Sequence, residues 1–445
     1  MGNAYAGVAA TGEDASTIFF NPAGLTRLCG NEAICALHAI FPVGNFKDRG
    51  TILYPPIAEA AGVGLPILGG SPGNGGEIAG IGNLYVSKKC NDRFAVGLGI
   101  NTPFGSATDY HPNWVGRYHA IRSELLTINI NPCVAFKIHP CLSVGIGFDV
   151  MYFSTTLTNK IDYGSIAWNA SLDLPEPQRT AIQNGLTALG FLPQTQDGRV
   201  RLEGKDWSYG WNIGVLWEPC ETTRVGFHYR SGFRHNVRGS EKFRDLPTLI
   251  QNPSLGGALA PFFGSIQASV ATPTNARATI DLPLLLSLSA YHEIGPCWAI
   301  MGDVTWTKWD VIDVLEVLFD NPAQPPSTTT VNWENTFRYA FGANYRPNCC
   351  WVFRTGAAWD VSPVPSKELY TPRFIDNDRF WLTGGFGYSF SACFHVDVGY
   401  AHLFVKEPRV DKTGFHLEED IIRGGLKGVY RAHTDIVSAQ IVYNF

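Results

Sequence analysis

The sequence predicts an all-β protein, a 14-stranded antiparallel transmembrane β-barrel, on three observations. Segments in which apolar and polar residues alternate recur along the chain, short turns alternate strictly with long loops, and the last strand ends on an aromatic residue, Phe445. A period of two places successive side chains on opposite faces of a strand. Loops that are sorted by length onto two rims are typical of a membrane barrel and not of a water-soluble sandwich.

The strands are expected where this alternation is found. From Leu142 to Tyr152, for example, apolar side chains alternate with small or polar ones. The apolar face is expected to meet lipid, with aromatic residues near the membrane interfaces, while Gly, Asn, Arg, Asp and His line the lumen. The predicted strands lie near residues 33–42, 78–88, 93–102, 124–137, 141–154, 208–217, 223–234, 277–292, 297–307, 335–345, 351–360, 379–390, 393–403 and 432–445.

Six very short links join neighbouring strands and should form the rim that faces the cell interior. They run from Cys90 to Asp92, His139 to Cys141, Pro219 to Thr222, Gly295 to Pro296, Pro347 to Cys350 and Ser391 to Ala392. The long connections between them are expected on the extracellular side.

The composition excludes several other classes of protein. No run of 18 apolar residues is present, which argues against a helical membrane protein. The net charge is −5 and no basic block occurs, which argues against a nucleic-acid partner. Met1 is followed directly by Gly-Asn-Ala-Tyr, without a charged start or apolar core, so we expect the export signal to be absent from this chain.

Cysteine is concentrated at the predicted turns. Each of the six links carries or adjoins at least one of the 10 cysteines, Cys29 and Cys35 flank the entry to the first strand on the same rim, and only Cys133 lies within a strand. These are either small buried residues or an oxidised rim that is disulfide-linked to other envelope proteins. No Cys/His spacing predicts a zinc site, and no cofactor is expected.

Residues 1–31 precede the first strand and lack its alternation. Phe19, Phe20 and the turn at Asn21-Pro22 indicate a compact piece. Because a barrel of this size encloses a lumen that its own side chains do not fill, residues 1–31 are predicted to form an N-terminal hatch that plugs residues 32–445.

Several runs along the whole chain resemble the FadL-type long-chain fatty-acid and hydrocarbon channels of Gram-negative outer membranes. They are Gly2 to Gly7, Glu13 to Ala15, Asn21 to Ala23, Thr102 to Gly105, Gly210 to Gly214, Phe353 to Gly356, Asp360 to Pro365 and Asp378 to Leu382. The resemblance implies a plugged barrel in the bacterial outer membrane that takes up hydrophobic molecules by diffusion and releases them through a gap at a kinked third strand. Gly97 and Gly99, followed by Pro103 and Phe104, allow such a kink, although glycine in a barrel strand also commonly faces the lumen.

Apolar residues in two long loops favour a ligand groove, or else pack against each other. They are Ile182, Leu186 and Leu189, at helical spacing after Pro175 and Pro177, and Phe262 and Phe263. Fatty-acid members of the family hold the carboxylate with basic residues near the end of the fifth strand and before the tenth. Here Asn159 takes the first place with Lys160 beside it, and residues 319–336 contain no Lys or Arg, so a neutral hydrocarbon is an alternative to a fatty acid.

The predicted function is therefore passive uptake of hydrophobic molecules, with outer-membrane lipid and the ligand as partners, and not catalysis. Charged residues in strands, such as Arg338, Arg354 and Asp360, are expected to pair in the lumen and pin the hatch. Two alternatives are a barrel enzyme, for which no Ser/His/Asp set is found, and a structural or adhesive barrel cross-linked through its cysteines.

Overall fold

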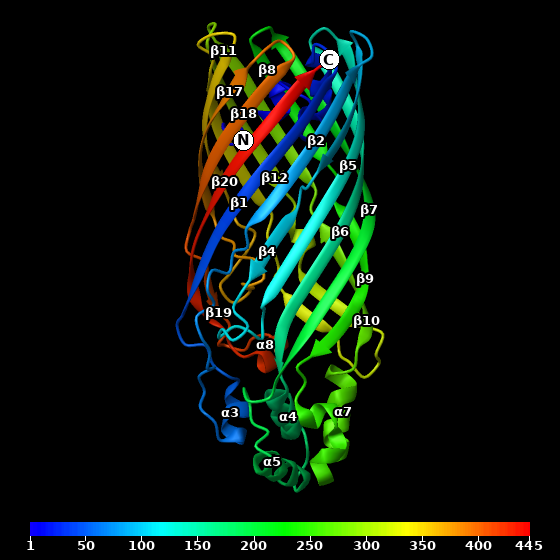
Figure 1. Ribbon diagram of the computed structural model, residues 1–445, viewed down its shortest axis with the longest axis vertical. Helices are drawn as coiled ribbons and strands as arrows, with labels where there is room; N and C mark the ends of the chain where they lie inside the picture. Colours follow the sequence, from blue (N-terminus) through cyan, green and yellow to red (C-terminus); the bar gives the residue numbers. More distant parts are fainter.

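The computed structural model describes residues 1–445 and consists of one tall, closed barrel (Figure 1). Its 14 antiparallel strands are β1 (Glu32–Asp48), β2 (Ala79–Lys89), β3 (Phe94–Asn101) continued by β4 (Gly105–Asp109), β5 (Arg122–His139), β6 (Leu142–Asp162), β7 (Asp197–Cys220), β8 (Thr223–Arg230) continued by β9 (Phe233–Arg244), β10 (Thr274–Leu282) continued by β11 (Leu285–Ile294), β12 (Trp298–Thr307), β15 (Thr336–Tyr345), β16 (Trp351–Asp360), β17 (Arg379–Ser389), β18 (Phe394–Val405) and β20 (Lys427–Asn444). The predicted fold class is confirmed.

The barrel closes between its first and last strands. β1 pairs with β20 over its whole length, from Glu32 opposite Asn444 to Asp48 opposite Gly428. Each remaining strand pairs with its neighbours in chain order, so no strand edge is left free along most of the wall. Closure of this kind satisfies the backbone hydrogen bonds that a lipid environment cannot.

The two faces of the strands differ as the alternation predicts. On β15, the outward side chains of Tyr339 and Phe341 are 48% and 61% exposed, whereas inward Asn344 is fully buried. Large apolar side chains are exposed on the outside all around the wall. This apolar exterior suits contact with hydrocarbon and would be costly in water.

The two rims carry short turns and long loops, respectively. At the top of Figure 1 short turns join the strands, and at the bottom the long connections fold into helices. These outer elements are α3 (Pro55–Ala61), α4 (Tyr163–Leu172), α5 (Gln178–Ala188), α6 (Thr248–Gln251), η2 (Pro253–Leu259), α7 (Ala260–Val270), η3 (Trp309–Val311), β13 (Val314–Phe319), β14 (Ser327–Thr330), β19 (Arg409–Asp411) and α8 (Glu418–Arg423). None of the helices has both the length and the apolar character needed to cross a membrane.

Several strands extend beyond the predicted ends on the side of the long loops. β6 continues to Asp162 and β7 begins at Asp197, and these two residues pair with each other at the end of the ladder. β7 then continues its pairing on its other side with β9 as far as Arg244. The predictions that β6 ends at residue 154 and that β7 begins at residue 208 are therefore wrong, because polar side chains replace apolar ones where the ladder projects beyond the hydrophobic band.

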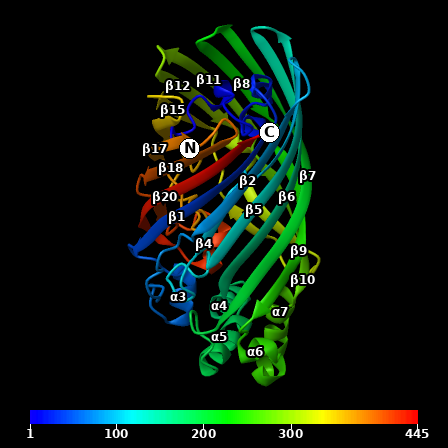
Figure 2. The same cartoon turned by 45° about the horizontal axis from the view of Figure 1, so that its top comes forward.

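The N-terminal segment, residues 1–31, lies inside the barrel near the rim of short turns (Figure 2). It contains α1 (Val8–Thr11), α2 (Thr17–Phe20) and the 3₁₀ helix η1 (Pro22–Arg27). Asn21 begins η1 by accepting a hydrogen bond from the Ala23 amide at 3.0 Å, with Pro22 at the first helical position. Ile18 and Leu25 pack in a buried cluster with the wall residues Tyr85 and Ala135.

All 10 cysteines are free thiols. Those at the short turns include the exposed Cys90, Cys220, Cys349 and Cys393. The expectation that only Cys133 lies within a strand is wrong, because β1 begins at Glu32 and contains the exposed Cys35, and β7 extends to Cys220.

Candidate functional site

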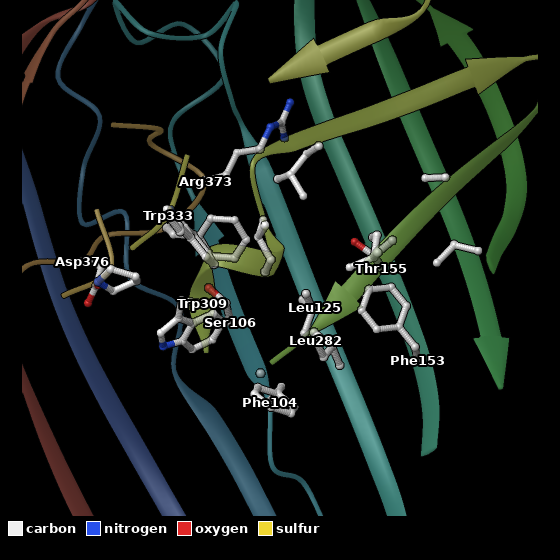
Figure 3. A pocket seen from close by; sticks show the side chains of 18 of the residues that line it. Phe104, Ser106, Leu125, Phe153, Thr155, Leu282, Trp309, Trp333, Arg373 and Asp376 are labelled. Atoms are coloured by element: carbon white, nitrogen blue, oxygen red, sulfur yellow. The ribbon is translucent and has the colours of Figure 1, made fainter. Parts of the chain in front are cut away.

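A cavity of about 580 Å³, here called the outer cavity, lies in the lumen toward the long loops (Figure 3). Its lining includes residues of β4 to β7, β9 to β12 and β15 to β17 and of the loops that follow β12 and β16. A volume of this size is typical of sites for small organic ligands.

Aromatic and aliphatic side chains form most of the outer cavity. Trp309 lies between Phe104 and Trp333, with ring centroids 6.2 Å and 5.2 Å away, and Trp333 also contacts Phe374 at 5.6 Å. The rest of the apolar lining includes Leu125, Phe153, Leu157, Val237, Ile280, Leu282 and Leu285. Such a surface offers no polar partner and favours an apolar ligand over water.

Charged groups occupy one side of the same cavity. The Arg379 guanidinium lies 2.9 Å from Asp360 and 3.0 Å from Asp376, so the two carboxylates share this one cation. Arg373 enters from the loop between β16 and β17 and donates hydrogen bonds to Ser123 Oγ at 3.0 Å and Asn159 Oδ1 at 3.1 Å.

A second cavity, here called the inner cavity, lies beside the N-terminal segment and has a volume of about 400 Å³. Phe19 and Phe20 line it from α2, with ring centroids 5.1 Å apart. His38, Ile81 and Asn83 line it from β1 and β2. The inner cavity therefore lies between the N-terminal segment and the wall.

The wall is interrupted beside both cavities. β3 ends at Asn101 and β4 begins at Gly105, and Pro103 between them lines both the outer and the inner cavity. The β2 segment from Ala79 to Asn83 pairs with β1, but the pairing of β2 with β3 begins only at Leu84. A single bridge between Gly76 and Thr108 closes the far end of this gap.

The break between β3 and β4 occurs at Pro103 and is fixed by Thr127, and not by the glycines of β3. Pro103 has no amide hydrogen to donate to a ladder. Phe104 is instead held to β5, because its amide donates to Thr127 Oγ1 at 3.0 Å and its carbonyl accepts from the same hydroxyl at 2.6 Å. Gly97 and Gly99 remain in the ladder on both sides, and at Gly97 a Cβ would lie 2.6 Å from Ile18.

Polar contacts attach the N-terminal segment to the lumen wall. Arg354 lies 2.5 Å from Asp397 and 3.8 Å from Glu13, and Arg346 pairs with Glu13 at 2.7 Å. Arg338 donates to the Ala4 carbonyl at 2.7 Å. Two of the three predicted pinning residues, Arg338 and Arg354, therefore contact the segment.

Asp360 does not contact the N-terminal segment. It pairs with Arg379 on the neighbouring strand and lines the outer cavity, so its expected role in pinning is wrong. The physical reason is its place at the end of β16, close to the long loops, whereas the segment lies near the short turns.

Lys160 also differs from the expectation. Its ammonium group lies 3.2 Å from Asp197 and 2.8 Å from the Asn113 side-chain oxygen, on the projecting ladder of β6 and β7, and it does not line the outer cavity. Asp197 additionally binds Arg117 at 3.1 Å. A lysine that is already paired in this network is not available to a ligand in the outer cavity.

The five predicted loop residues pack mainly with one another. Leu186 and Phe263 are fully buried in one cluster of the outer helices, with Ile182 and Phe262 packed against it. Only Leu189 is largely exposed, at 43%. None of the five lines the outer cavity, so the structure favours the alternative of mutual packing for most of them.

Sequence reasoning missed the residues that form the outer cavity itself. Trp309, Trp333, Phe374 and Arg373 lie in loops whose patterns predict no regular element. The aromatic residues of these two loops were the only available signal.

Together these features define a class of protein: an outer-membrane β-barrel whose lumen contains its N-terminal segment and two cavities beside a break in the wall. The chain belongs to the family described as outer membrane protein transport protein (OMPP1/FadL/TodX), whose sequence model matches residues 1–445. The predicted family and outer-membrane localisation are thereby confirmed, and the chain is an outer-membrane transport protein.

Individual relatives agree with this assignment. The chain is 28% identical over 407 residues to a long-chain fatty acid transport protein of Escherichia coli O6:H1, covering 91% of this chain and 84% of the relative. Its fold resembles the crystal structure of a Pseudomonas aeruginosa FadL homologue, with a TM-score of 0.84 at 22% identity, over 100% and 97% of the two chains. It also resembles the Ralstonia pickettii toluene transporter TbuX, with a TM-score of 0.65 at 16% identity, over 100% and 98%. At such identities the structural likeness concerns the fold alone.

Proposed function

We propose that this protein is a passive channel that takes hydrophobic molecules from outside the cell into the outer cavity and releases them sideways into the membrane. Its family comprises outer-membrane transport proteins, and one relative is named for long-chain fatty acids and one structural neighbour for toluene. Transfer follows the concentration gradient and involves no chemical step, so neither a catalytic residue nor an energy source is required.

One observation carries the proposal: the gap in the wall adjoins both cavities. Pro103 lines both, and the unpaired edge of β2 from Ala79 to Asn83 lies on the other side of the gap. The outward-facing positions on that edge are Gly80 and Gly82, which have no side chains to cover the gap. A lateral exit lets an apolar solute move from an apolar cavity to lipid without crossing water.

The N-terminal segment acts in this proposal as a hatch. It occupies the lumen at the end near the short turns, where it packs against several strands and is held by ion pairs. It therefore blocks a straight aqueous route through the barrel, while Phe19 and Phe20 present an apolar surface to the inner cavity.

Narrowing the passage beside the gap tests the route. Ser106 lines the outer cavity at the start of β4, and Ser106→Trp should reduce uptake of labelled palmitate into cells on the order of tenfold by filling the passage. Ser269→Trp, on the outer helix α7, is the matched control and should transport normally. Normal uptake by Ser106→Trp would overturn the lateral route, and absence of palmitate and hydrocarbon uptake by the unmodified protein would overturn the function.

A further inference from the structure

Three basic side chains, here called the basic row, lie side by side on β7, β9 and β10, which are neighbouring strands on the right of the barrel in Figure 1. Arg238 on β9 lies directly opposite Lys205 on β7 and directly opposite Arg277 on β10. All three are exposed, whereas Val237 and Ala276, which adjoin two of them in sequence, are buried on the inner face. The basic row therefore points outward from the wall, away from the lumen.

The basic row has no counterion within the protein. No carboxylate lies within 4.0 Å of any of its three charged groups, whereas Arg234 on the same face of β9 pairs with Asp281 at 2.8 Å. Like charges that lie directly opposite each other on neighbouring strands repel and are destabilising. An anion from outside the chain would remove this repulsion.

The acidic side chains near the basic row are already paired with other cations. Glu203 on β7 lies 2.5 Å from Arg201 and 3.8 Å from Lys242. Asp197, at the start of β7, binds Arg117 at 3.1 Å and Lys160 at 3.2 Å. This part of the outer face is therefore basic, although the chain as a whole has a net charge of −5.

The basic row lies at the extracellular edge of the apolar band. The outward apolar residues of β7 run from Trp217, near the short turns, to Tyr209 and Trp207, which are 66% and 53% exposed. This length matches the about 9–11 residues with which a tilted strand crosses hydrocarbon. The Trp207 ring lies 5.1 Å from that of Tyr152 on β6, and such aromatic side chains mark a membrane interface. Because Lys205 is the next outward residue of β7, the basic row faces the lipid headgroups on the side of the long loops.

We propose that the basic row binds the phosphate groups of lipopolysaccharide, the anionic glycolipid of the outer leaflet. Guanidinium and ammonium groups donate charge-assisted hydrogen bonds to phosphate oxygens. The acyl chains of the same molecule then lie along the apolar face that begins at Trp207. This continuity with an apolar surface favours a lipid over a free anion. The contact lies outside the transport route and goes beyond the proposed function.

Binding of fluorescent lipopolysaccharide to the full chain in a nonionic detergent tests this contact. EDTA is added, so that no divalent cation bridges phosphate to the protein. The row variant, Lys205→Gln with Arg238→Gln and Arg277→Gln, should bind about 100-fold more weakly, and Arg238→Gln alone about fivefold more weakly, because each basic side chain near an anionic lipid surface contributes separately. The affinity of the unmodified protein should also fall as the NaCl concentration rises, since salt screens exposed charges.

Two further variants separate the basic row from charge in general. The charge-preserving variant, Arg238→Lys with Arg277→Lys, should bind nearly as well as the unmodified protein. The matched control, Lys88→Gln with Arg93→Gln and Lys137→Gln, removes the same number of charges at the rim of short turns and should bind normally.

Loss of binding in the row variant alone supports the lipid site. Unchanged binding by the row variant, or an equal loss in the matched control, overturns it. Dephosphorylated lipopolysaccharide should bind the unmodified protein weakly, and tight binding of this lipid would overturn the assignment to phosphate. Inorganic phosphate at millimolar concentration should not displace the lipid, and displacement would assign the basic row to the free ion and overturn the lipid site.

Discussion

The side-chain amide of Asn21 donates to the Val215 carbonyl at 3.0 Å and so ties the N-terminal segment to β7. The same amide donates to the Ala9 carbonyl at 2.6 Å, which joins two turns of the segment to each other. This contact is possible only because Gly214 presents no side chain: a Cβ there would collide with the Asn21 side-chain oxygen. The N-terminal segment therefore lies so close to β7 that no side chain fits at Gly214.

Gly214→Val should displace the N-terminal segment and raise the ionic conductance of the barrel several-fold, because a branched side chain cannot share the space of Asn21. Planar-bilayer recording measures this directly. Gly302→Val on β12 is the control, since its nearest neighbouring atom would be 3.8 Å from the new Cβ. Equal conductance in the two variants would show that the segment is not held at Gly214.

Arg354→Ala should also increase leakage of small polar solutes, because it leaves Asp397 and Glu13 with one cation fewer in a largely enclosed lumen. Breaking a buried ion pair by removing one partner costs about 3–5 kcal/mol. Asp360→Ala should leak no more than the unmodified protein, since Asp360 pairs with Arg379 and not with the N-terminal segment. Liposome swelling in small sugars compares the two variants.

Acid should loosen the N-terminal segment through Glu13. Burial raises the pKa of Glu13, but the positive charges of Arg354 and Arg346 together lower it by more. The pKa of Glu13 in the folded protein therefore lies below the ordinary 4.5. A carboxyl group whose pKa is lower in the folded protein than in the unfolded chain stabilises the fold, and this stabilisation is complete above pH 4.5. It is lost as the pH falls through the pKa of the folded protein. Conductance should therefore rise as the pH falls below the ordinary glutamate pKa of 4.5, and Glu13→Gln should conduct more already at pH 7. A flat profile from pH 7 to that range would contradict this role.

The cysteines of the short turns should react with a polymer-linked maleimide from the periplasmic side, while buried Cys133 should not.

If these thiols form disulfides with other envelope proteins, non-reducing gels of envelopes will show bands of higher mass that collapse on reduction. A monomer alone on such gels would reject the cross-linking hypothesis.

The sequence by itself determined the barrel. Alternation with a period of two is a local property of each strand, and the rule that short turns and long loops lie on opposite rims needs no tertiary information. The predicted strand at 351–360 coincides with β16, and the strands at 335–345 and 379–390 differ from β15 and β17 by one residue at one end. The residues that contact the wall from the N-terminal segment, such as Asn21, were also visible as a turn motif.

Only the tertiary structure decided which side chains meet the cavities. Lys160 was the nearest basic residue in sequence to the expected carboxylate position, but its pairing with Asp197 depends on how far the β6–β7 ladder extends. Arg373 reaches the cavity because its loop folds back across the lumen to Ser123. The path of a loop and the pairing of its charged residues depend on contacts between segments that are far apart in the sequence. No local sequence pattern contains the energies of these contacts. The side chains that line the cavity are therefore decided only when the barrel has closed.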